Sequence, residues 1–405
     1  MNISTSETHE TQYITEFHKF PKTEPSWLEG IRSQAMERFQ VLGFPRNRRG
    51  NEFWKYTDVS ALLTKNFEHE PANSAAVGSI PSGLSVINLN GAKGYLKDTA
   101  RLYLAKFAPF ETDPFISLNT ALFQDAVLIH AAEGIKIKNP IKIHLHSNDG
   151  KVTHPRILVI AEDDSKIDIS LSHFGHSSGD YFANVVSEVF VGKNASVSLF
   201  RAQREKPDSF HVANTFVSVS ENGRFDYFSM DNGGGIARHN VNVSLSGQNA
   251  SCNLSGVYVT RNTQHVDNHT LIHHLDSNTR SDQLYKGILL DSSRAVFVGQ
   301  VEVSPGCKKV ETHQTNKTLL LSPSAEINTQ PVLDIATDDI QASHGNAVGQ
   351  VDRDSIFYLM TRGLDFVNAQ KILMEGFLFE ILKSVQNESL LLESTESINK
   401  TIDEL

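Results

Sequence analysis

The chain has 405 residues, of which 39% are hydrophobic and 21% are charged, and its formal net charge is −10. This is the composition of a soluble globular protein, and its acidic balance argues against nucleic acid or an anionic membrane as the main partner. No apolar run approaches the roughly 20 residues that a membrane span needs, and the polar start resembles no signal or transit peptide, so we expect a cytoplasmic protein.

The first region, residues 1–65, is predicted to be helical. Trp27, Ile31, Ala35 and Phe39 recur at the helical period, and Gly43 is placed to end that helix. A basic loop with Arg46, Arg48 and Arg49 follows, and charge runs of this kind are usually solvated surface.

The second region, residues 66–350, consists of short segments that alternate apolar and polar residues, which is the pattern of β-strands. Turn signals such as GKNA near 192, ENGR near 221 and GQNA near 247 separate the segments. So many short strands must form a barrel, a sandwich or a β-solenoid. The likeness of VSLSGQNASCNLSG to SVSLFRA favours the solenoid, but periodicity alone does not exclude the barrel.

The third region, residues 351–405, is predicted to be helical again. Asp354 is placed to cap one helix, Gly363 to end it, and Asp365 to cap a second helix that continues to about Val385. The second helix carries a helical-period stripe of apolar side chains, which would pack on the strand core or on a partner. The stripe consists of Phe366, Ala369, Ile372, Leu373 and Phe377. The tail after Asn387 reads as polar.

Several segments resemble one protein family in their order along the chain. They are EFWKYTD (52–58), SLNTALFQDAVLIH (117–130), HPRILVIAEDDS (154–165), the stretch 267–303, and THQTNKTLLLSPSAEINTQPVLDIATDDIQASHGNAVGQVDRDSIFYLMTRGL (312–364). The last segment resembles the C-terminal signature of the SufB/SufD family of iron–sulfur cluster assembly proteins. Together the segments span most of the chain.

This resemblance implies a right-handed parallel β-helix core with helical N- and C-terminal regions. It also implies a scaffold subunit of a SufBCD complex that pairs with SufB and binds the ATPase SufC through the C-terminal helices, here Phe366 to Leu382. SufB-like chains carry a cysteine where this chain has Thr315 and a glutamate where it has Gly345, so these departures point to the SufD branch. The resemblance leaves open whether a flavin binds the complex.

His344 is the main candidate for a site residue. A neutral imidazole can ligate iron, and the family implies that this position contributes to a transient iron–sulfur cluster at the SufB interface. Ala342 stands where SufD-like chains often carry a cysteine, so the cluster's thiolates would come from SufB. The alternative is a histidine in an ordinary Ser-His-Gly turn.

A second group of candidates lies between residues 265 and 274. On a strand, His265, Asp267, His269 and His273 would share one face, and they are plausible metal ligands. Residues in a row along one strand do not converge easily on one ion, because alternate side chains are about 7 Å apart. A polar ladder on the outer face is therefore the favoured interpretation.

The two cysteines, Cys252 and Cys307, exclude a disulfide framework and are too few for a usual four-thiolate cluster. Cys252 is expected in the core. Cys307 precedes Lys308 and Lys309, whose charges would favour a thiolate and are compatible with a sulfur-relay role. An ordinary turn cysteine is the favoured interpretation.

The sequence predicts no ATP site, because the glycine run Gly233–Gly235 lacks the lysine of a P-loop and no such motif occurs elsewhere. Two other functions stay open: a SufB-like homodimeric scaffold and, less favoured, a carbohydrate-active β-solenoid enzyme. The enzyme would need paired carboxylates such as Asp163 with Asp164, or Asp338 with Asp339. Neighbouring residues on a strand point to opposite faces, so neither pair would flank one bond.

Overall fold

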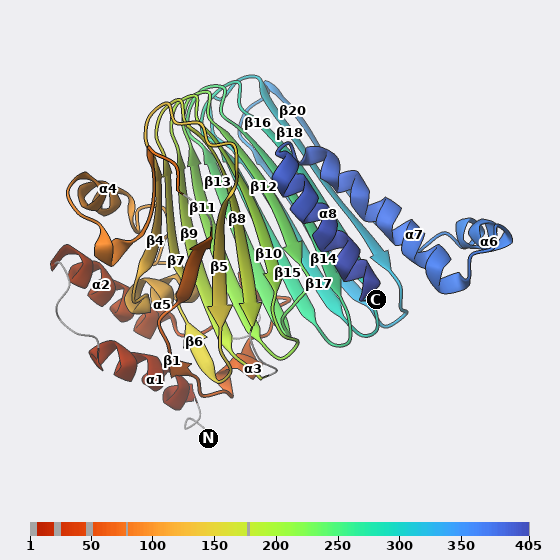
Figure 1. Cartoon of the computed structure of the whole chain (residues 1–405), viewed down its shortest axis with the longest axis horizontal. Helices are drawn as coiled ribbons and strands as arrows, with labels where there is room; N and C mark the ends of the chain where they lie inside the picture. The colour runs from red at the N-terminus through yellow and green to blue at the C-terminus, as the bar shows by residue number, and fades with distance from the viewer. Residues whose placement is uncertain (1–5, 20–25, 46–51, 78–79, 176–178, 405) are drawn as a thin grey trace.

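A computed structural model describes residues 6–19, 26–45, 52–77, 80–175 and 179–404. From β7 onward, successive strands alternate between two facing sheets, and within each sheet the strands from β4 onward pair in parallel, so the chain coils as a β-solenoid (Figure 1). This confirms the mainly β fold class and excludes the barrel.

The two sheets contain strands of similar length. The first sheet takes β4 (Ala126–Ala131), β7 (Arg156–Ala161), β9 (Phe182–Val191), β11 (Phe210–Val219), β13 (Ile236–Leu245), β15 (His265–His274), β17 (Arg294–Val303) and β19 (Glu326–Ile335). The second sheet takes β5 (Ile141–Ser147), β8 (Lys166–Gly175), β10 (Ser196–Arg204), β12 (Arg224–Asp231), β14 (Ser251–Thr260), β16 (Arg280–Leu289), β18 (Val310–Leu320) and β20 (Ile340–Gly349).

The turns between the sheets explain the spacing of the turn signals. Asn194, Asn222 and Asn249 occupy equivalent turns and have positive φ angles of 54°, 55° and 61°. Asparagine tolerates this left-handed conformation better than most residues. Its side chains also form a ladder, in which Asn222 Nδ2 donates to Asn194 Oδ1 at 3.0 Å and Asn249 Nδ2 donates to Asn222 Oδ1 at 2.9 Å.

The main core lies between the two sheets, where alternate residues of each strand point inward. Stacked strands repeat the same inward positions, as in Val197, Phe225 and Cys252 on β10, β12 and β14. This repeated burial is why the strand segments alternate apolar and polar residues.

The two ends of the solenoid differ. At the N-terminal end, β3 (Leu84–Asn88) pairs antiparallel with β4, and β2 (Asn73–Val77) pairs antiparallel with β5. A short pair, β1 (Glu68–His69) with β6 (Lys151–Thr153), lies beside them. At the C-terminal end, β19 and β20 are the last strands of their sheets. We call this the open end, because its two edge strands are ten residues long, whereas the edge strands β2 and β3 at the other end are five residues long.

N-terminal helices cover the outer face of the first sheet (Figure 1). They are α1 (Ser6–Lys19), α2 (Ser26–Leu42), α3 (Ser60–Leu63), α4 (Tyr95–Tyr103) and α5 (Pro114–Leu122), with 3₁₀ turns at Glu52–Trp54 and Leu89–Gly91. Helix α2 ends just before Gly43, which has a φ of 59°, as predicted. The loop with Arg46, Arg48 and Arg49 lies outside the described residues. Helices α4 and α5 precede the first solenoid strand, and the division at residues 65 and 350 stays a prediction.

The C-terminal segment forms α6 (Arg353–Thr361), α7 (Phe366–Phe379), a 3₁₀ helix (Glu380–Ser384) and α8 (Glu388–Asp403). Asp352, not Asp354, caps α6, since its side chain accepts from the backbone N–H groups of Asp354 and Ser355. Helix α8 forms from the polar tail of the region predicted to be helical, and it packs with α7 on the outer face of the second sheet, whereas α6 projects beyond the solenoid (Figure 1). None of the described helices is long and apolar enough to cross a membrane.

Candidate functional site

His344 lies on β20, the edge strand of the second sheet, and not in a turn. It pairs in register with Gln314 of β18, and its side chain is exposed. On β18 the buried residues Thr312, Gln314 and Asn316 point into the solenoid. Because paired residues of adjacent parallel strands share a face, His344 also points to the inside, which is uncovered there because no coil follows.

The neighbours of His344 on β20 follow the same alternation. Ala342 and Asn346 are in register with Thr312 and Asn316 and share the inner face with His344. Ser343 points the other way, where its hydroxyl lies 2.8 Å from Nδ1 of His313. The imidazole of His344 therefore lies at the mouth of the solenoid interior and faces whatever covers the open end.

The predicted histidine group lies on the outer face of the first sheet, as the alternation indicated. Asp267 is its centre: it is 2.9 Å from His269 Nε2, 2.5 Å from Arg238 Nη1, and it accepts a hydrogen bond from Thr57. His265 Nε2 lies 2.8 Å from the same Thr57 hydroxyl. The carboxylate is thus committed to an ion pair and to the N-terminal segment.

His273 does not join this cluster. Its Nε2 lies 3.7 Å from Glu302 and 3.4 Å from the Ser304 hydroxyl, near the end of β15. Within the described ranges, no group of three or more His, Cys, Asp or Glu side chains is arranged to hold a metal ion. We therefore assign His265, Asp267 and His269 a structural role beneath residues 52–58.

The two cysteines are buried. Burial raises the pKa of the Cys307 thiol, and the carboxylate of Asp276 adds to this effect. The Cys307 sulfur lies 3.7 Å from the backbone oxygen of His274. The raised pKa of Cys307 is the opposite of the lowered pKa expected from Lys308 and Lys309, so the structure does not favour a thiolate at this position.

The paired carboxylates considered for an enzyme lie in turns and not on strands. Asp163 accepts from the backbone N–H of Lys193 at 2.7 Å, and Asp164 accepts from Asn194 Nδ2 at 3.0 Å. Both carboxylates thus belong to the turns that join the sheets. Gly234 likewise lies in a turn, with a φ of 79°.

The five apolar residues predicted to bind a partner do not share one environment. Ala369 is fully buried, and Phe377 packs against the second sheet with its ring 4.5 Å from Lys286 Nζ. Leu373 is half-buried, whereas Phe366 and Ile372 are exposed. The stripe therefore both anchors α7 and contributes to an outer surface.

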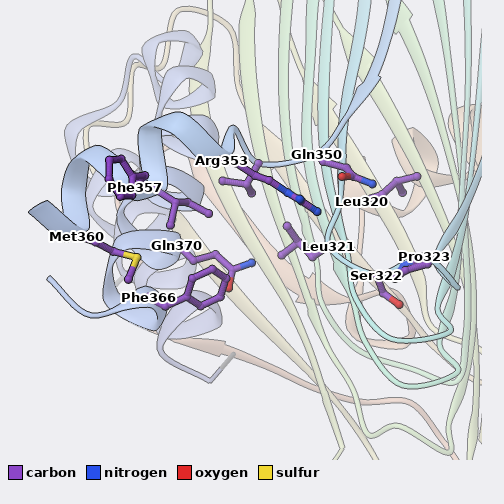
Figure 2. Close-up of a pocket in the computed structure, with 12 residues that line it drawn as sticks. Leu320, Leu321, Ser322, Pro323, Gln350, Arg353, Phe357, Met360, Phe366 and Gln370 are labelled. Carbon is purple, nitrogen blue, oxygen red and sulfur yellow. The ribbon is translucent and has the colours of Figure 1, made fainter.

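Helices α6 and α7 together present the exposed apolar surface that we call the α6–α7 surface. It consists of Phe357, Tyr358, Met360, Phe366, Val367 and Ile372. Beside it is a pocket of about 480 Å³ between these helices and the turn after β18 (Figure 2). Leu321, Pro323, Ile356 and Phe366 are among its apolar lining residues, and Arg353 supplies a positive charge.

A polar cluster that the sequence analysis did not predict lies inside the solenoid. Arg201 forms an ion pair with Asp231 and donates from Nε to the Tyr227 hydroxyl at 2.7 Å, and all three side chains are buried. His239 Nε2 lies 3.3 Å from Asp231. Alternation along SVSLFRAQ places Arg201 on the same face as the buried Val197 and Leu199, but only the pairing of the strands shows that Asp231 and Tyr227 are its partners.

Comparisons with known proteins agree with the fold and the signature. Residues 144–377 match the family model described as "SUF system FeS cluster assembly, SufBD core domain". Residues 6–79 and 71–143 match the model of the SufBD protein N-terminal region. The core match alone covers more than half of the chain.

Similar proteins span nearly the whole chain. An iron–sulfur cluster assembly SufBD family protein of Synechocystis is 27% identical over 94% of this chain and 92% of its own length. Protein ABCI7, chloroplastic, of Arabidopsis thaliana is 30% identical over 90% of this chain and 84% of its own. The iron–sulfur cluster assembly protein SufD of Escherichia coli is 26% identical over 88% of this chain and 90% of its own.

Proposed function

Because the chain belongs to the SufBD family of the SUF iron–sulfur cluster assembly system, we propose that it is the SufD-type scaffold subunit, which pairs with SufB and binds the ATPase SufC. ATP hydrolysis would then be carried out by SufC. The cluster is the cargo of the assembly, held at the interface between subunits.

The observation that carries the proposal is the difference between the two ends of the solenoid. The N-terminal edge strands β2 and β3 are five residues long and pair antiparallel with their neighbours, whereas β19 and β20 present two ten-residue edges at the other end. Folded proteins usually pair or cover a long edge strand, because its free N–H and C=O groups would otherwise bind further strands. A partner with the same two-sheet fold would extend both sheets at once.

His344 is the chain's contribution to the cargo site in this proposal. Its imidazole is exposed at the open end and would be covered by SufB after pairing. One imidazole cannot hold a cluster, so the thiolates must come from SufB. The buried Cys252 and Cys307 are not placed to supply them.

The α6–α7 surface is the proposed docking site for SufC. Its exposed side chains include three large apolar ones, Phe357, Phe366 and Ile372, and the adjacent pocket can receive an apolar side chain of a partner. Nucleotide binding by SufC can rearrange the scaffold only if one arrangement of α6–α7 and the solenoid binds ATP-loaded SufC more tightly.

A homodimeric scaffold is the second candidate, since the same open end could pair with a second copy of this chain. In such a dimer both copies would bring His344 and neither would bring an accessible thiol. The thiolate requirement therefore favours the pair with SufB.

The test is co-purification of this chain with SufB and SufC, as wild type and as His344→Ala, followed by anaerobic reconstitution. We expect both forms to assemble and the variant to lose iron. If the chain associates with neither protein, the scaffold proposal is wrong. If both forms assemble and hold the same iron, the assignment of His344 is wrong.

A further inference from the structure

Gln314 is a buried amide without a hydrogen-bond partner in the described structure. Its side chain is 3% exposed, and neither Nε2 nor Oε1 is bonded. A buried amide that lacks partners costs about 1–3 kcal/mol, so each such group calls for an explanation. The neighbouring amide of Gln283 donates to the hydroxyl of Thr270 while its Oε1 has no partner, so of these two amides only Gln314 lacks a partner at both polar atoms.

A glycine on the facing sheet leaves space for the side-chain amide of Gln314. Gly299 of β17 faces Gln314 across the interior, and a Cβ at position 299 would overlap the Nε2 atom of Gln314. The amide therefore occupies space that any other residue at position 299 would fill. This space lies in the last covered layer of the solenoid, next to the open end.

Gln314 is also the in-register partner of His344 on the adjacent strand, and both point to the inner face. Adjacent strands are about 4.8 Å apart, so a glutamine side chain reaches the ring of its in-register neighbour. Histidines that ligate metals usually donate their second ring N–H to a carboxylate, a carbonyl or water, which fixes the ring orientation.

We propose that Gln314 is a positioning residue for His344: its side-chain carbonyl accepts the ring N–H of His344 and sets which ring nitrogen faces the cargo. This rests on the proposed role of His344 as a cluster ligand. The bond forms when a partner covers the open end and His344 turns toward the cargo, and it satisfies the acceptor that is unpaired in the isolated chain.

The test compares Gln314→Met with wild type in the complex with SufB and SufC. Methionine matches the length of glutamine but accepts no strong hydrogen bond. We expect the variant to assemble normally and the isolated variant chain to have an unchanged or raised urea midpoint. The half-point, which is the chelator concentration that removes half of the iron from the complex, should fall about 10-fold. Gln314→Glu retains an acceptor oxygen and should restore most of the half-point.

Two controls separate this proposal from the function on which it rests. Gln341→Met makes the same change on the outward face of β20 and should leave the half-point unchanged. In a His344→Ala background, Gln314→Met should cause no further loss, because residues that act as one unit are not additive.

The outcomes are distinguishable. If His344→Ala lowers the half-point and Gln314→Met does not, the positioning role is wrong and the proposed function stands. If His344→Ala has no effect, the role of His344 as a ligand fails and the positioning role fails with it. If Gln314→Met lowers the half-point equally in both backgrounds, Gln314 does not act through His344, and the inference is overturned.

Discussion

The Arg238 guanidinium lies 2.5 Å from the carboxylate of Asp267, and both side chains are fully buried on the outer face of the first sheet. The ring of Trp54 covers the guanidinium at 4.0 Å, and Thr57 donates to the carboxylate. The segment 52–58 is thus fastened to the solenoid through a charged pair rather than through apolar contacts alone. EFWKYTD and the distant stretch 267–303, two of the segments that resemble the family, are therefore in direct contact.

Replacing Asp267 by asparagine should destabilise the chain by about 3–5 kcal/mol, because the charge of Arg238 would stay buried without its partner. Urea unfolding measures this. Asp282→Asn is the matched control: Asp282 pairs with Arg280 on the surface, and its loss should cost less than about 1 kcal/mol. Equal costs for the two variants would contradict an anchoring role for Asp267.

The same pair predicts how acid acts on this anchor. Burial would raise the pKa of the Asp267 carboxyl, but the positive charges of Arg238 and His269 lower it below its usual value. A carboxyl with a depressed pKa stabilises the fold above its unfolded pKa of about 3.9, and this contribution is lost as the pH falls through its folded pKa. The stability difference between wild type and Asp267→Asn should therefore be constant from pH 5 to 7.

His274 predicts a second effect of acid, at higher pH. It is buried, with Nδ1 2.7 Å from the Thr279 hydroxyl and Nε2 2.9 Å from that of Ser281, and burial lowers its pKa to about 4. Between pH 6.5 and 4 the unfolded chain binds the extra proton, so stability falls as the pH falls. The loss attributable to His274 is about 1.4 kcal/mol per pH unit.

In urea unfolding at pH 5 to 6.5, His274→Asn should remove this share of the pH slope. Part of the slope should remain, because burial also lowers the pKa values of His154, His173 and His239. A variant with the full wild-type slope would show that His274 accepts no proton on unfolding.

Much of the fold could be predicted from local chemistry. Strand 236–245 alternates apolar and polar residues in its second half, and asparagines mark several of the turns between strands. The tail after Asn387 shows no clear apolar stripe that would mark helix α8, because part of the helix's buried face is made of small polar residues. Ser394, Ser397 and Thr401 pack against the sheet alongside Ile398. A pattern of hydrophobic residues does not reveal a helix face that is buried because its side chains are small.

The candidate site was less accessible from the sequence. His344 was located by its signature, but its direction depends on the register between β18 and β20, which no local pattern encodes. Gln314 sits in the polar run QTNKT, where neither face is apolar, so nothing marks it as buried. The inward side of these strands is defined only by the sheet that faces them.

Asn222 offers a test of the turn ladder. Its φ of 55° is costly for residues with a Cβ that cannot bond locally, and its side chain links Asn194 to Asn249. We expect Asn222→Ala to destabilise the chain by about 1–2 kcal/mol. Asn222→Gly, which relieves the backbone cost, should lose less in the same urea experiment. If glycine is no better than alanine, the backbone conformation is not what asparagine provides there.

Substitutions in the apolar stripe on α7 should affect either SufC binding or stability, depending on whether the residue is exposed or buried. Phe366 and Ile372 are 53% and 43% exposed, so Phe366→Ser and Ile372→Ser should change the free energy of unfolding by less than about 0.5 kcal/mol. If SufC binds the α6–α7 surface, each variant should weaken its binding about 10-fold, as central apolar contacts of interfaces do. Titration calorimetry with purified SufC measures the affinity.

Phe377→Ala should do the reverse. Its ring packs in the cluster between α7 and the second sheet and covers Lys286 Nζ, which also bonds the backbone oxygen of Phe377 at 2.5 Å. Its loss should destabilise the chain by about 2–3 kcal/mol, less than a fully buried phenylalanine. Leu102→Ser, an exposed leucine on the distant helix α4, is the control that should alter neither property. If the Phe366 and Ile372 variants bind SufC normally, the ATPase docks elsewhere and the exposed half of the stripe serves another contact.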